Sequence, residues 1–359
     1  MKILDRYLIR EMAGPFAFGI VAFVLLFVSA NILFQLMELV SQLHLGLGTA
    51  VWLFFLKLPG FVVYTVPLAT LLAILVAFGR LSGDSELVAM YAGGVSFQRL
   101  VVPLVVVGLV LSAATAGLND IVVPAANRRA EDIIRTASQR AGAAAQEGVL
   151  LKDVSDGQTV RIVYADRLDI ATGEMTNPTI VWFSHGAPAM VTVARVARWQ
   201  GKDWELLHGA SYLLQPQKPA SSTFEQTVAH FPTSPREISE MSLTPEQMTY
   251  QELRERIRQE AERHRPVAEL QLTLYQKFSI PFACLVFALI APPLGARSHR
   301  GSSAIGMGIA ILIGFAYYVV SHYMAVVTQS GQLSPLWAAW LPNIAGAAVG
   351  LGLIFAVRK

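Results

Sequence analysis

Residues that could do chemistry are dispersed along this chain of 359 residues and form no catalytic or metal-binding pattern. The single cysteine, Cys284, lies in an apolar run, which excludes an internal disulfide and a thiolate metal site. No two of the seven histidines have the close helical spacing of a zinc site. No segment matches a phosphate-binding loop or the nucleophile elbow of hydrolases. We therefore expect no catalytic residue, metal or cofactor, and no ATP hydrolysis by this chain itself.

The most informative polar stretch runs from Arg80 to Ser96, between two apolar segments. Ser82 or Asp84 can cap a short helix there, because both side chains accept hydrogen bonds from free backbone N–H groups. Gly93-Gly94 can end the helix. The pattern predicts a short helix within residues 82–94.

Helical spacing places Leu87, Met90 and Tyr91 on one face of this predicted helix, with Asp84 and Glu86 nearby. An apolar face with an acidic rim suits insertion into a groove on another protein. The alternative is a helix lying in the lipid surface. Such helices favour basic residues, so the acidic rim favours docking.

Composition indicates a membrane protein with one polar insertion. Apolar residues make up 54% of the chain and charged residues 15%, against about 25% charged in soluble domains. Residues 120–270 hold 17 Lys/Arg and 20 Asp/Glu, so the flanking blocks carry few charges. The basic pI comes from those apolar flanks, which argues against a nucleic-acid partner.

Six apolar windows are long enough to cross the roughly 30 Å hydrocarbon core as helices. Four of them are residues 12–37, 58–79, 100–119 and 278–296. The other two lie within residues 301–357, on either side of a polar break at 328–335. None holds Asp, Glu, Lys or Arg, which argues against an ion-coupled pump. For Asn31 and His322, their most notable polar residues, we expect helix packing.

The basic residues of the short loops predict the orientation, because positive flanks stay in the cytoplasm. Short loops at 41–50 and 328–334 carry no Lys or Arg. The opposite side carries Lys2, Arg6, Arg10, Arg80, Arg99, Arg297, Arg300, Arg358 and Lys359. Both termini are therefore expected in the cytoplasm and the polar block outside.

The polar block begins with residues 120–148, which we expect to continue the third helix as a stalk interrupted near Pro124. Short β-branched or alternating runs separated by turn residues follow, as in a small sandwich or jelly roll. They are 149–151, 159–164, 179–183, 190–196, 204–207, 211–214 and 223–230. Capping boxes at 244–247 and 249–252 then predict a helix, and the charged run 254–265 returns the chain to the membrane.

The expected fold is an α-helical membrane protein with six transmembrane helices, three before and three after an inserted extracytoplasmic all-β, jelly-roll-like domain. Its parts are residues 1–119, including the short helix at 82–94, then 120–270 with helical stalks, and then 271–359.

The opening Leu4-Asp5-Arg6-Tyr7-Leu8, the loop at 85–94 and the three-plus-three layout together resemble the LptF/LptG (YjgP/YjgQ) permeases. In that family two permease subunits pair, and a cytoplasmic LptB ATPase dimer drives them. They extract lipopolysaccharide from the bacterial inner membrane and pass it over jelly-roll domains to LptC and LptA. The resemblance implies a non-catalytic permease subunit with its β-domain in the periplasm.

The resemblance also assigns roles to residues. It makes 84–94 the coupling helix and Glu86 the polar contact to the ATPase. Family members form a lipid-A cavity chiefly from the first, second and fifth helices, so residues 21–36 and 305–325 should include lining residues; the candidates are Asn31, Phe34, Gly306 and Gly314. Candidates for the lipid-A phosphates near the outer rim are Lys57, Lys277, Arg128, Arg129 and Arg135. The alternatives are snorkelling for the lysines and ordinary solvation for the arginines.

Some family members carry a lysine in the outer part of the first helix, whereas residues 31–38 of this chain contain no basic residue. The sequence therefore leaves open an LptF-like half, an LptG-like half or a member that pairs with itself. Two other classes remain as alternatives: a membrane-anchored scaffold or sensor whose β-domain binds an envelope partner, and a membrane-embedded enzyme that acts on lipid.

Overall fold

The protein is described by a computed structural model, which covers residues 3–43, 45–140, 145–155, 158–169, 172–184, 187–214, 220–231, 234–235, 245, 248–262, 266–296 and 303–357. At 29–43, 135, 138–140, 145–155, 158–159 and 303–305 only the backbone is described. Within these ranges the helices are α1 (Ile3–Leu43), α2 (Leu47–Gly83), α3 (Glu86–Ala92), α4 (Phe97–Gly117), η1 (Leu118–Val122), α5 (Val123–Arg140), α7 (Tyr250–Glu262), α8 (Ala268–Ala296), α9 (Ser303–Gln329) and α10 (Pro335–Val357).

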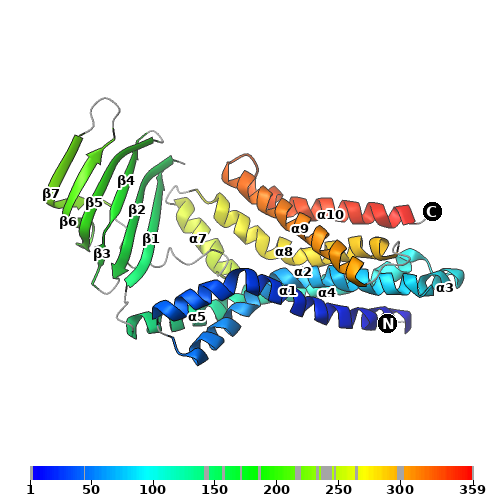
Figure 1. Ribbon diagram of the computed structural model, residues 1–359. Coiled ribbons are helices and arrows are strands. Elements are labelled where there is room, and N and C mark those ends of the chain that lie inside the picture. The colour runs from blue at the N-terminus through cyan, green and yellow to red at the C-terminus, as the bar shows by residue number, and fades with distance from the viewer. Residues whose placement is uncertain are drawn as a thin grey trace.

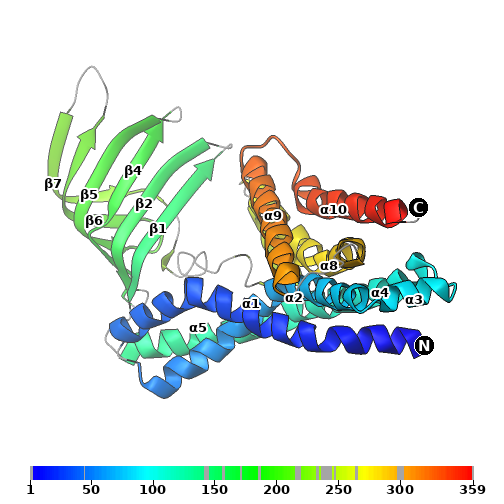
Figure 2. The same cartoon turned by 45° about the vertical axis from the view of Figure 1, so that its right-hand side comes forward.

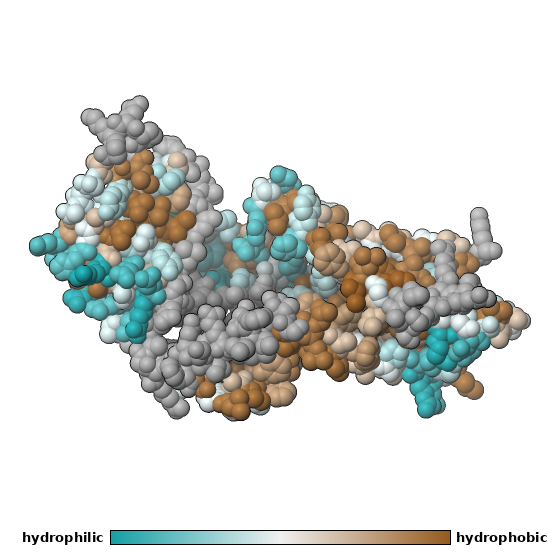
Figure 3. All heavy atoms as spheres, in the orientation of Figure 1, coloured by the Kyte–Doolittle hydropathy of each residue, from teal (hydrophilic) through white to brown (hydrophobic). Residues whose placement is uncertain are grey.

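Six helices in the described ranges are long and apolar enough to cross a membrane, which confirms the predicted spans. They are α1, α2, α4 continued into α5, α8, α9 and α10. The break between the last two lies where the sequence predicted it, between Gln329 and Pro335. Both ends of the chain and α3 lie at one end of the helices, and the β-strands lie at the other (Figures 1 and 2). Hydrophobic residues dominate the helical part of the surface in Figure 3.

α2 is the central helix of the bundle, and it packs against α1, α4, α8 and α9. Its 37 residues span about 55 Å at 1.5 Å per residue, which exceeds the hydrocarbon core. The excess projects toward the β-strands, where Leu53 and Leu56 pack against Ala126 and Ala130 of α5. The second span and the stalk thus form one arm beyond the bundle.

Close contacts and polar side chains hold the other helices together. A Cβ added at Gly108 of α4 would lie 2.8 Å from Ala288 Cβ of α8, so these two backbones approach closely. Asn343 of α10 donates to the Ser279 carbonyl of α8 at 2.7 Å and accepts from the Tyr317 hydroxyl of α9 at 3.2 Å. Such contacts replace the hydrophobic force that lipid does not provide between helices.

The third span does continue as a stalk, and its interruption is a π-helical turn. In η1 the Val123 N–H donates to the Leu118 carbonyl, five residues earlier. Pro124 follows directly, and its ring lacks an N–H and would clash with a carbonyl four residues back. The wider turn accommodates this residue without breaking the helix.

The inserted domain is all-β, as predicted, and consists of one antiparallel, barrel-like sheet. Its strands are β1 (Ala145–Ser155), β2 (Gln158–Asp169), β3 (Glu174–Thr176), β4 (Thr179–Ser184), β5 (Ala187–Trp199), β6 (Trp204–Leu213) and β7 (Ala220–Ala229). β3 and β4 together fill the place between β2 and β5, with a kink at Asn177, whose φ is 49°. With β3 and β4 counted as one row, the order is therefore a meander in which each row lies beside the next.

The sheet differs from the prediction in two places. The runs predicted separately at 204–207 and 211–214 belong to one strand, β6, which continues through His208 with a positive φ and ends at Leu213. β3 is missing from the prediction, because its polar–apolar–polar run is only three residues long. The inner side of the sheet buries Val163, Ile180, Ala194 and Trp204, and Trp204 stacks on Phe231 with ring centroids 5.7 Å apart.

The capping box at 249–252 is confirmed at the start of α7. The Thr249 hydroxyl accepts from the Glu252 N–H at 3.3 Å, and the Glu252 carboxylate accepts from the Thr249 N–H at 2.9 Å. Tyr250 N–H also donates to Asp120 of η1 at 2.6 Å, which ties α7 to the stalk. The box predicted at 244–247 lies largely outside the described residues.

We predict that Gly108→Ala destabilises the bundle by about 1–3 kcal/mol, because its methyl group overpacks the contact of α4 with α8. Gly117→Ala is the matched control, since an added Cβ there meets nothing within 4 Å. Unfolding midpoints of both variants in detergent test this. An equal midpoint for the two variants would contradict the close packing.

Candidate functional site

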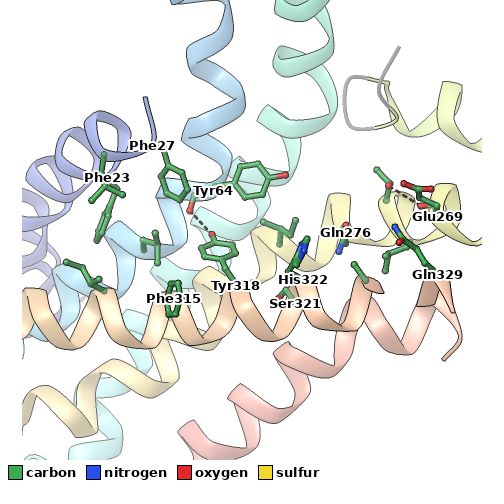
Figure 4. Close-up of a pocket in the computed structure, with 18 residues that line it drawn as sticks. Phe23, Phe27, Tyr64, Glu269, Gln276, Phe315, Tyr318, Ser321, His322 and Gln329 are labelled. Atoms are coloured by element: carbon green, nitrogen blue, oxygen red, sulfur yellow. Dashed lines mark hydrogen bonds between the residues drawn. The ribbon is translucent and has the colours of Figure 1, made fainter. Parts of the chain in front are cut away.

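A pocket of about 630 Å³ opens between α1, α2, α8 and α9 (Figure 4). It is lined by Phe23, Leu26, Phe27, Tyr64, Leu68, Glu269, Leu272, Thr273, Gln276, Ile280, Ile311, Gly314, Phe315, Tyr318, Ser321, His322, Ala325 and Gln329. Leu26 is 54% exposed and Phe315 68% exposed, so large apolar side chains lie open on the bundle surface.

The pocket is largely apolar, and most of its polar side chains gather toward one end (Figure 4). Phe23, Phe27 and Phe315 lie in the part nearer the middle of the bundle. Glu269 and Gln276 of α8 and His322 and Gln329 of α9 lie toward the ends of these helices that approach the β-domain. This division matches a molecule with apolar chains and a polar head.

Two contacts fix α9 against α2 at the centre of the pocket. The Tyr318 hydroxyl donates to the Tyr64 carbonyl at 2.7 Å. A Cβ added at Gly314 would lie 2.1 Å from Leu68 Cδ2, so glycine leaves room for this leucine at the pocket wall. The width of the pocket therefore depends on a residue without a side chain.

Of the predicted cavity residues whose surroundings the structure describes, one lies in the pocket lining and one does not. Gly314 lies in the pocket lining, whereas Gly306 faces Val76 of α2 and lies outside it. The side chains of Asn31 and Phe34 lie outside the described residues. α1, α2 and α9 supply lining residues as expected.

The sequence missed part of the pocket. α8 contributes Glu269, Thr273 and Gln276, although this helix was not expected to line a cavity. His322 was expected to serve helix packing, but its exposed side chain lies in the pocket. The polar spacing of 269, 273 and 276 on one helix face is the signal that could have found them.

The predicted phosphate contacts do not gather at the pocket. Lys277 is 4% exposed, and its ammonium donates to the Asn119 carbonyl at 3.4 Å, so this buried side chain does not reach the pocket. Lys57 is half-buried on α2, and Arg129 is exposed on α5. The Arg135 side chain lies outside the described residues. The Lys57 and Arg129 assignments stay predictions.

Arg128 has a partner within the chain. Its guanidinium pairs with the Glu252 carboxylate at 2.9 Å, which joins α5 to α7. The Thr249 N–H, the Thr249 hydroxyl and nearby Arg128 hold the pKa of Glu252 below its usual range, although partial burial opposes them. Arg128 therefore helps to position the stalk in this conformation.

α3 forms as the sequence predicted at its end but not at its start. Gly94 has a φ of 80° and donates to the Tyr91 carbonyl at 2.9 Å, and Val95 N–H donates to Met90 at 3.0 Å, which is a Schellman cap. The N-cap position is occupied by Ser85, which has a φ of 60° and makes no side-chain capping hydrogen bond. The predicted cap Ser82 instead donates from its hydroxyl to the Ala296 carbonyl of α8 at 2.9 Å.

The face of α3 differs from the predicted one. Leu87 is 2% exposed and packs into the bundle, and Met90 packs against the same core. Val88 is 60% exposed and Tyr91 40% exposed, so these two residues form the outer apolar face. Leu87 and Met90 lie three residues apart and face the bundle, so Val88 and Tyr91, which directly follow them, face away from it.

Glu86 also has partners within the chain. Its carboxylate accepts from the Tyr7 hydroxyl at 2.6 Å and lies 3.5 Å from Arg80. Arg80 pairs with Asp84 at 3.1 Å as well. Two residues expected to face an ATPase are therefore held by α1 and α2.

A family model described as lipopolysaccharide export system permease LptF/LptG matches residues 6–355. The chain belongs to this family. None of the curated proteins compared with the chain matches it. As an LptF/LptG permease it is a component of lipopolysaccharide export and an inner-membrane, multi-pass protein with six apolar helices and an inserted β-domain. The pocket and α3 are its candidate functional sites.

We predict that Gly314→Leu lowers the lipopolysaccharide that co-purifies with this LptF/LptG permease, because the new side chain displaces Leu68 into the pocket. Gly308→Leu is the matched control on the same helix, since an added Cβ there meets nothing within 4 Å. Quantification of bound lipid by mass spectrometry in nanodiscs tests this. Equal lipid retention by the two variants would exclude the pocket as the binding site.

Proposed function

We propose that the chain is the transmembrane permease subunit of an ATP-driven exporter that extracts lipopolysaccharide from the inner membrane and passes it to a periplasmic bridge. The observation that supports this most is the pocket, which is largely apolar, with phenylalanines toward one end and most of its polar side chains toward the other. Lipopolysaccharide has the same division into acyl chains and a polar head. Exposed Leu26 and Phe315 allow acyl chains to enter from the side.

The proposed assembly contains a second LptF/LptG-type permease, as a hetero- or homodimer, and an LptB-type cytoplasmic ATPase dimer that binds the ATP. LptC- and LptA-like proteins receive the lipid in the periplasm. Both termini and α3 face the cytoplasm in this proposal, since Arg80 and Arg99 flank α3 and the loop after Gln329 carries no basic residue.

α3 is the proposed docking element for the ATPase. Val88 and Tyr91 present an apolar surface, and exposed Asp84 lies beside it. Leu87 and Met90 anchor α3 to the bundle. In this proposal, a displacement of α3 by the ATPase therefore also displaces the helices that α3 packs against. The docking face that we propose therefore consists of Val88 and Tyr91, and it no longer includes Leu87 and Met90, which the sequence had suggested.

Lipid-A phosphates need cations, and the described pocket lining contains no Lys or Arg. Phosphate binding in this proposal therefore depends on residues beyond that lining. The paired permease subunit and the exposed Arg129 of α5 are two sources. Glu269, Gln276 and His322 are assigned to the sugar hydroxyls and amides of the headgroup.

We predict that Val88→Asp abolishes recruitment of the ATPase while the permease stays folded, because a charge replaces the exposed apolar contact. Met90→Leu is the control, since it conserves the volume of a side chain that packs inward. Co-purification with tagged permease, together with ATPase activity of the isolated complex, tests this. Undiminished recruitment of the ATPase by the Val88→Asp variant would contradict the proposal that α3 binds the ATPase.

The same experiment discriminates between the exporter and the other classes. An ATPase, a second permease-like chain and lipopolysaccharide in the purified complex support the exporter. Recovery of the chain with an envelope protein but without an ATPase would favour a scaffold or sensor.

A further inference from the structure

The first turns of α1 are tied to both ends of the loop that carries α3. Asp5 pairs with Arg99 at 2.6 Å, at the start of α4. Glu11 pairs with Arg80 at 2.6 Å, at the end of α2. Tyr7 lies between these two residues of α1 and reaches Glu86, the first residue of α3. A single helix thus contacts α2, α3 and α4.

Tyr7 and Arg80 form the centre of this network. The Tyr7 hydroxyl donates to Glu86 at 2.6 Å and accepts from Arg80 at 3.0 Å. The same guanidinium reaches Glu11 at 2.6 Å, Asp84 at 3.1 Å and Glu86 at 3.5 Å. One arginine therefore joins three carboxylates from α1, α3 and the turn before α3.

An isolated exposed ion pair holds two elements only weakly. This network differs because buried side chains on either side support it. Leu8 is 1% exposed and Leu87 2% exposed, and both belong to the main core of the bundle. The Tyr7 ring also packs against that core, so its hydroxyl is held in place. α1 and α3 are therefore each anchored in the same core, and the Tyr7–Glu86 hydrogen bond joins them.

α1 is a single helix from Tyr7 to Phe23 and Phe27, which line the pocket, and it contains Pro15, whose ring removes one helical hydrogen bond on the way. At 1.5 Å per residue the distance along the helix from Tyr7 to Phe23 is about 24 Å. α1 is therefore the element that joins the first turns to the wall of the pocket.

We propose that Tyr7 and Arg80 are positioning residues that fasten α3 to α1, so that a displacement of α3 reaches the pocket through α1. This inference rests on the proposed function, in which the docked ATPase displaces α3. Neither residue contacts lipid or ATPase in this account; both act through Glu86 and α1.

The first test uses the permease alone in nanodiscs. Spin labels are placed at exposed Arg10→Cys and Val88→Cys in a Cys284→Ala background, and the distance distribution is measured. We expect one narrow distance in this background and a broadened distribution in Tyr7→Phe, which keeps the ring but loses the hydroxyl. Tyr323→Phe, on a side chain that is 62% exposed on α9, is the matched control.

Two outcomes of this measurement decide the inference. Glu86→Ala is expected to broaden the distribution as Tyr7→Phe does, and the double variant to be no broader than the wider single variant. An unchanged distribution in Tyr7→Phe would overturn the tether, whether or not an ATPase binds.

The second test uses the complex with the ATPase. An environment-sensitive dye at Leu26→Cys reports on the pocket, and its emission is compared without nucleotide and with trapped nucleotide. We expect Tyr7→Phe to reduce the emission change at least about threefold at unchanged ATPase recruitment and thermal stability. A merely structural tyrosine would lower stability and leave the emission change of the folded complex intact.

The two experiments distinguish a failure of the proposed function from a failure of the Tyr7 and Arg80 tether. Failure of the unsubstituted permease to recruit an ATPase would contradict the proposed function, and the spin-label experiment would still decide the tether. A full emission change in Tyr7→Phe would overturn the transmission through α1 while the exporter proposal stands.

Discussion

The packing of α2 against its neighbours is the interaction on which the rest of the structure depends. Lipid provides no hydrophobic force between helices, so the bundle relies on close contact and a few hydrogen bonds. Two of those bonds join α2 to α9 and α8: Tyr318 to the Tyr64 carbonyl and Ser82 to the Ala296 carbonyl. The first lies in the pocket wall, and the second lies just before α3. One buried helix therefore positions both candidate sites.

The end of the bundle toward the β-domain is organised by a second set of contacts. Asn119 donates to the Lys277 carbonyl at 3.3 Å and accepts from the Lys277 ammonium, which joins the π-helical turn to α8. Asp120 accepts from Tyr250 N–H, and α7 then leads the chain back to the membrane. The stalk and the return helix thus meet at one junction, which connects the sheet to the helices on both sides.

The spans, the inserted all-β domain and the stalk could be predicted, because charge-free length, turn spacing and capping boxes are local signals. The face of α3 could not be predicted. Leu87 and Met90 have the same helical spacing whether they face a partner protein or the bundle. Only the packing of α3 on the bundle shows that they face the bundle. The contribution of α8 to the pocket and the burial of Lys277 likewise depend on contacts between distant segments.

The proposed function requires that the pocket between α1, α2, α8 and α9 holds lipopolysaccharide. Photocross-linking tests it most directly: a photoreactive residue replaces Phe315 in the pocket, or Val349, which is 57% exposed on α10 and lies outside the lining. We expect lipopolysaccharide adducts at Phe315 that disappear when ATP is added to the complex with the ATPase, and few adducts at Val349. Equal adducts at both positions, or none at Phe315, would contradict it.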